Sequence, residues 1–99
     1  MNLEETFVSV WRQALVDQAG SVELAGDAFA VRRTARSRLR QIDFKAEGRE
    51  FRGLEQNPRT PSRWAQLARS GKRVMQFLAE GRYVAVVVEG KLTWYGKSR

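Results

Sequence analysis

Short glycine turns divide most of this chain into runs of alternating apolar and polar residues. Three of the turns place a glutamate and a glycine before a base, at Glu47–Arg49, Glu80–Arg82 and Glu89–Lys91. Glycine supplies the positive φ that tight hairpin turns require. Because strands joined by such short turns run antiparallel, the pattern predicts a sheet that is built from hairpins.

Between the turns, the residues repeat with the period of two that is typical of strands. In the segment 82–89, Tyr83, Ala85 and Val87 are expected on one face and valines on the other, which predicts a central strand covered on both sides. The segment 73–79 fits either a continued helix or a strand, and the glycine before it favours the strand. The predicted strands span 21–25, 28–33, 39–46, 49–54, 73–79, 82–89 and 92–95.

Two helices are predicted. Residues 3–18 carry apolar side chains at spacings of three and four, with Asn2 as the N-cap and Gly20 as the stop signal. A second helix is expected over 61–70, because threonine followed by proline at Thr60-Pro61 is a typical helix start. Its predicted buried stripe consists of Trp64, Leu67 and Ala68.

With 99 residues the chain has the size of one domain, which we predict to span residues 1–99. The fold class follows from the order of the elements. We expect an α+β protein with a mostly antiparallel sheet of about six to seven strands built from hairpins, an N-terminal helix and one inserted helix.

The composition removes most catalytic chemistry. The chain has no histidine and no cysteine, so triads that depend on either residue cannot be built. The remaining route is a magnesium site formed by the carboxylates Asp43, Glu47, Glu50 and Glu55, but charges two residues apart on a strand usually mark its solvated face. We therefore predict a protein that is not an enzyme and has no metal or cofactor.

No charged segment followed by an apolar run is found near Met1, and the longest apolar run, Tyr83–Val88, is six residues. A membrane helix needs roughly 20. A cytoplasmic protein without a membrane partner is therefore expected.

The charge is unevenly distributed. The first 31 residues hold five acids and one base, whereas the rest hold 17 bases and six acids, and the net charge of the chain is +7. Arginine makes up most of the excess and suits phosphate and carboxylate partners. Five arginines fall between Arg32 and Arg40, where they either bind an anion or form a solvated loop that Asp43, Glu47 or Glu50 partly neutralises.

The segment around the second helix is also basic. Lys72 and Arg73 suit the negative end of a helix dipole, whereas Arg59 and Arg63 lie at its positive end, where cations are unfavourable without an anion. The local pattern therefore favours an anion site, while Trp64 is expected in the core.

Trp94 and Tyr95 should point to opposite faces of the last strand. With Arg82 and Tyr83 on the neighbouring strand, they form either an aromatic and basic surface that stacks bases or two rings that cover the sheet beneath the helices.

We predict a small basic binding module without catalytic activity, whose partner is single-stranded or structured nucleic acid. The alternative is a protein–protein adaptor or small subunit that binds an acidic protein. The residues predicted to contact nucleic acid are Arg36, Arg38, Arg40, Arg59, Arg63, Lys72 and Arg73.

Overall fold

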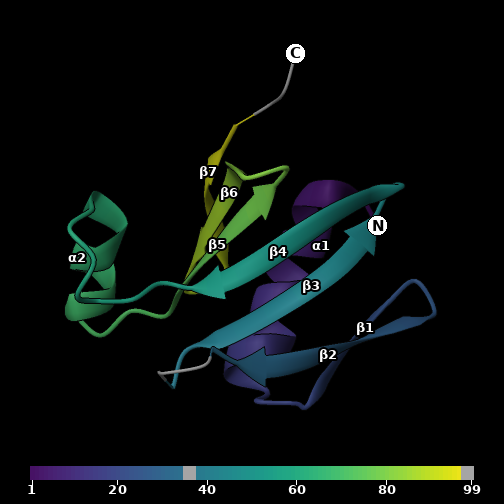
Figure 1. The fold of residues 1–99 in the computed structure, drawn as a ribbon, viewed down its shortest axis with the longest axis horizontal. Helices are drawn as coiled ribbons and strands as arrows, with labels where there is room; N and C mark the ends of the chain where they lie inside the picture. The colour runs from purple at the N-terminus through teal and green to yellow at the C-terminus, as the bar shows by residue number, and fades with distance from the viewer. Residues whose placement is uncertain (35–37, 97–99) are drawn as a thin grey trace.

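The protein is an α+β fold with one seven-stranded antiparallel sheet (Figure 1). The computed structural model describes residues 1–34 and 38–96. Helix α1 (Leu3–Trp11) continues into a π-helical turn, η1 (Arg12–Val16), and helix α2 (Arg63–Arg69) is inserted between the fourth and fifth strands. The strands are β1 (Ser21–Leu24), β2 (Asp27–Arg33), β3 (Arg40–Ala46), β4 (Arg49–Glu55), β5 (Val74–Ala79), β6 (Arg82–Val88) and β7 (Lys91–Tyr95).

The strands lie in the sheet in the order of the chain, from β1 to β7. The turns that the sequence predicts are confirmed, and both residues of each glutamate–glycine pair have positive φ, as in Glu47 at 52° and Gly48 at 71°. Two consecutive residues with positive φ form the hairpin turn whose twist matches that of the strands it joins. The sheet is therefore a continuous meander of hairpins, interrupted only by α2 and the β2–β3 connection.

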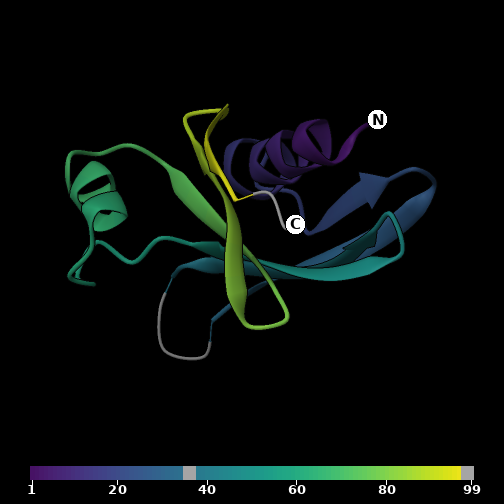
Figure 2. The same cartoon turned by 90° about the horizontal axis from the view of Figure 1, so that it is seen from above.

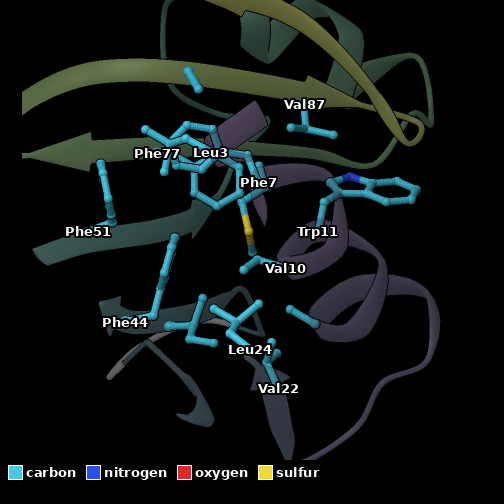
Figure 3. Close-up of a cluster of buried hydrophobic side chains, with 14 of the residues drawn as sticks. Leu3, Phe7, Val10, Trp11, Val22, Leu24, Phe44, Phe51, Phe77 and Val87 are labelled. Carbon is cyan, nitrogen blue, oxygen red and sulfur yellow. The ribbon is translucent and has the colours of Figure 1, made fainter. Parts of the chain in front are cut away.

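Helix α1 packs along one face of the sheet, which curves around it (Figure 2). The predicted N-cap is confirmed, since Asn2 Oδ1 accepts the N–H of Glu5 at 2.8 Å. Phe7 is fully buried at the centre of the core (Figure 3). Its ring lies 4.6 Å from that of Phe77 and 5.3 Å from that of Phe51, measured between centroids.

The first helix ends earlier than the sequence predicts. A π-helical turn closes it at Val16, where the N–H of Asp17 bonds to the carbonyl of Arg12 at 3.0 Å. Gln18 then adopts the positive φ of 48° that the sequence assigned to Gly20. Gln13 within this wide turn bonds to the backbone of Glu23 on β1, and the positive φ after the helix falls at Gln18 and not at Gly20.

Helix α2 covers the other face of the sheet at one end. Trp64 and Leu67 pack against Val74, Val86 and Val88, which confirms that β6 is apolar on both faces and covered on both sides. No helix of the described residues is long and apolar enough to cross a membrane.

The predicted start of α2 at Pro61 is wrong. The N–H of Ser62 bonds to the carbonyl of Thr60 at 2.9 Å, which makes 60–62 a turn, and Ser62 Oγ then accepts the N–H of Ala65 at 3.1 Å. Serine replaces threonine as the cap because its extended backbone places its hydroxyl at the first helical turn. Ala65 is the buried residue of this helix, whereas Trp64 is only partly buried and reaches a groove.

Candidate nucleic-acid interface

A groove of about 670 Å³ lies on the sheet face opposite α1. We call it the aromatic groove because Trp64, Tyr83 and Trp94 line it. Its floor is a row of directly opposed residues on β4 to β7, and its walls come from α2, the segment before α2, and the ends of β2 and β3. The floor residues are Leu54, Gln76, Val86 and Trp94.

Tyr83 reaches the aromatic groove because β6 contains a bulge. Phe77 pairs with Ala85 but Leu78 pairs with Tyr83, so Val84 is an extra residue in the ladder. A bulge of one residue turns the following side chain to the opposite face. The prediction that Tyr83 shares a face with Ala85 and Val87 is therefore wrong, and its side chain is 55% exposed in the groove.

Trp94 and Tyr95 point to opposite faces, as the alternation predicts. The ring of Tyr95 lies 6.2 Å from that of Phe7 beneath α1, whereas Trp94 is 36% exposed and lines the aromatic groove. A Cβ atom at Gly96 would lie 2.6 Å from Cη2 of Trp94, so the indole lies close against the glycine. Tyr95 therefore covers the sheet beneath a helix, whereas Trp94 forms part of an exposed aromatic surface. Each of the two alternatives holds for one of the rings.

The described lining of the aromatic groove contains one basic residue. Arg63 lines it, and its guanidinium carbon lies 4.2 Å from the ring centroid of Trp64. This cation–π contact stabilises a cation at the start of α2 without an anion. It therefore gives Arg63 a structural explanation that the sequence pattern lacked, and a seven-residue helix capped by Ser62 adds no anion site of its own.

Other arginines adjoin groove residues in the chain. Arg38 and Arg40 flank Leu39, Arg59 precedes Thr60, and Arg82 precedes Tyr83. Arg38, Arg59 and Arg82 are exposed, and Arg40 is partly buried. The predicted site residue Arg36 lies outside the described residues.

Arg73 is held by protein groups. Its Nη2 lies 2.7 Å from Oε2 of Glu55, and its Nη1 donates to the carbonyl of Leu15 at 3.4 Å. Glu55 is the one carboxylate among the described residues that line the aromatic groove, and this ion pair neutralises it. Arg73 therefore connects β5 to the N-terminal helix, while Lys72 is exposed after α2.

The carboxylates considered for a metal site are dispersed. Asp43 lies between Arg32 at 2.6 Å and Arg52 at 2.7 Å, and the hydrogen bond from Arg52 holds the pKa of Asp43 below its usual value. Glu50 pairs with Lys45 at 3.8 Å. Within residues 1–34 and 38–96, no group of three acidic side chains is arranged to hold a metal ion. Asp43 also pairs with Arg32, one of the five arginines between Arg32 and Arg40. The alternative in which these arginines form a solvated loop expects such partial neutralisation.

Sequence reasoning missed the floor of the aromatic groove. Gln76 is the one polar residue of β5, and this break in an apolar strand was the available signal for it. Gln56 and Leu54 also line the groove and gave no comparable signal. Comparison of the chain with protein-family models, curated proteins and solved structures found no match.

Proposed function

We propose that this protein is a small non-catalytic module that binds single-stranded nucleic acid in the aromatic groove. The observation that carries the proposal is the convergence of Trp64, Tyr83 and Trp94 on one groove. Every base has a flat face, and stacking on an aromatic side chain contributes about 1–3 kcal/mol per base. A duplex keeps its bases stacked inside, so the groove favours a single strand.

The charge supports the same partner. The chain carries a net charge of +7, Arg63 lies in the groove, and the exposed Arg38 and Arg59 are next to lining residues in the chain. Arginines placed around stacked bases can contact the phosphates that join them. The one acidic side chain in the described lining is already paired with Arg73, so it repels a phosphate backbone only weakly.

A second candidate function is the adaptor, and one of the two edges of the sheet, β7, favours it. At the β1 edge, the amide of Gln13 accepts the N–H of Glu23 at 2.9 Å and donates to its carbonyl at 3.3 Å. At the β7 edge, no described residue bonds to the outer side of the strand. An open edge beside a basic groove would suit an extended acidic peptide, which would add one strand to the sheet.

Titration of labelled oligonucleotides of about ten nucleotides tests the proposal. For Tyr83→Ala and Trp94→Ala, the loss of one stacking ring should weaken binding about 5- to 150-fold. Val16→Ala changes an exposed apolar side chain of η1 and is the matched control. Contact with about four to six phosphates predicts a slope of log affinity against log salt of roughly −3 to −4.

Two results would contradict the proposal. One is undetectable binding at about 50 mM salt, where phosphate contacts are strong. The other is unchanged affinity in both groove variants. Binding of an acidic peptide that protects β7 amides from hydrogen exchange, without oligonucleotide binding, would instead establish the adaptor.

A further inference from the structure

Two glutamine side chains bring hydrogen-bonding groups into the aromatic groove. Gln76 lies in the floor between Leu54 and Val86 and is partly buried. Its side-chain amide has no hydrogen-bond partner among the described residues, although three apolar or aromatic floor residues share its row. The amide atoms of Gln76 are accessible from the groove, so a ligand there could accept from and donate to them.

Gln56 adds a second amide from the end of β4. It is 5% exposed, its Nε2 donates to the carbonyl of Asn57 at 2.9 Å, and its Oε1 is buried without a partner. Buried acceptors almost always have a hydrogen bond, so an orphan in a groove lining needs an explanation. Because the nitrogen is engaged, the oxygen is the atom left for a ligand.

The two amides lie near each other. The N–H of Gln56 bonds to the carbonyl of Val74 at 2.8 Å, and Gln76 is two residues further along the same strand. Positions related in this way across two strands are diagonal neighbours, within reach of long side chains. The groove therefore combines stacking surfaces with two amide oxygens and one free amide NH₂ group.

We infer that the aromatic groove selects a base whose Watson–Crick edge carries an exocyclic amino group beside an unprotonated ring nitrogen, which describes adenine and cytosine. This inference rests on the proposed function. The base would stack on Trp94, its amino group would donate to the oxygens of Gln76 and Gln56, and its ring nitrogen would accept from Nε2 of Gln76. Adjacent donor and acceptor atoms of glutamine match such an edge. Uracil has a carbonyl in place of the amino group, which leaves the fixed oxygen of Gln56 unpartnered.

A comparison of oligo-dC with oligo-dU, each about ten nucleotides long, isolates this chemistry. The two polymers share ring size and phosphates and differ at the edge that the amides would read. The wild-type protein should bind oligo-dC at least about tenfold more tightly. Gln56→Leu keeps a side chain of similar size without the amide, so its preference for oligo-dC should fall to about one while its affinity for oligo-dU stays within about threefold.

The controls separate this inference from the function on which it rests. Gln66→Leu changes an exposed glutamine of α2 and should keep the preference. Gln76→Leu should weaken binding to both polymers, because the amide of Gln76 can turn to pair with either base, and it serves as the second readout if Gln56→Leu does not fold.

Equal wild-type affinity for the two polymers overturns the inference and leaves single-strand binding intact. A preference that persists in folded Gln56→Leu overturns the role of Gln56. Absence of binding to either polymer overturns the proposed function as well.

Discussion

Gly96→Ala should move the indole of Trp94 without disturbing the rest of the fold. The added Cβ would lie 2.6 Å from Cη2 and 3.1 Å from Cζ2 of the ring. Carbon atoms in contact are about 3.5 Å apart, so the far end of the ring must shift by about 0.9 Å. Gly96 does not have a positive φ, so alanine brings no backbone strain.

The size of the effect on binding follows from that shift. A gap of about 0.5–1 Å loses a quarter to a half of a dispersion contact. Applied to a stacking free energy of about 1–3 kcal/mol, this loss is about 0.3–1.5 kcal/mol, or a 2- to 12-fold weaker affinity for single-stranded DNA. The melting temperature should change little, because the ring is already 36% exposed.

Fluorescence anisotropy with a labelled oligonucleotide measures the affinity, and tryptophan emission reports the movement of the ring. Gly20→Ala is the matched control, because a Cβ at that position meets no atom within 4 Å. If both the affinity and the emission are unchanged in Gly96→Ala, the claim that the position of Trp94 determines binding is refuted. A large fall in melting temperature would show that Gly96 serves the fold.

Three further predictions concern the fold. Phe7→Ala should lower the free energy of unfolding by about 3–5 kcal/mol in urea titrations, because it leaves a cavity at the centre of the core. A loss below about 1 kcal/mol would contradict the placement of Phe7 there. Gln13→Ala should expose the β1 edge and produce concentration-dependent self-association in light scattering. Gln66→Ala is the control and should not self-associate. Equal behaviour of the two variants would show that the β1 edge needs no cap. The lowered pKa of Asp43 means that its ion pair with Arg52 stabilises the fold above about pH 4 and is lost as the pH falls through the folded pKa. Urea titrations from pH 3 to pH 7 should show this step, at most about 1 kcal/mol for an exposed pair, in the wild type and a smaller one in Asp43→Asn; identical profiles would argue against the pair.

Much of the fold could be predicted from local chemistry. A glutamate–glycine pair determines a turn wherever it occurs, and Asn2 with Glu5 determines a helix start, because both depend on residues a few positions apart. The same local reasoning predicted that β6 is apolar and covered on both faces, although it lies next to the edge strand and not at the centre of the sheet. The helix boundaries at Val16 and Ser62 were missed, because a π-helical turn ends the first helix and a turn at Thr60 precedes the second.

The candidate site was harder to predict because it depends on pairing between strands. The bulge at Val84 inverts the face of Tyr83, and a second irregularity lies between the pairs Val86–Trp94 and Val87–Leu92. Neither leaves a signal in the local alternation of residues. The arginines were visible as charges, but the ion pair between Arg73 and Glu55 appears only once distant segments pack together, and the contact of Arg63 with the neighbouring ring of Trp64 depends on side-chain orientation within the helix.

The indole N–H signals of the three tryptophans test the central claim most directly. Trp64 and Trp94 line the aromatic groove, whereas Trp11 is buried on the other face and donates its N–H to the carbonyl of Arg73 at 3.1 Å. In a nitrogen–proton NMR titration with single-stranded DNA, the signals of Trp64 and Trp94 should shift and that of Trp11 should stay in place. Binding that leaves Trp64 and Trp94 unmoved would contradict the assignment of the groove as the nucleic-acid site.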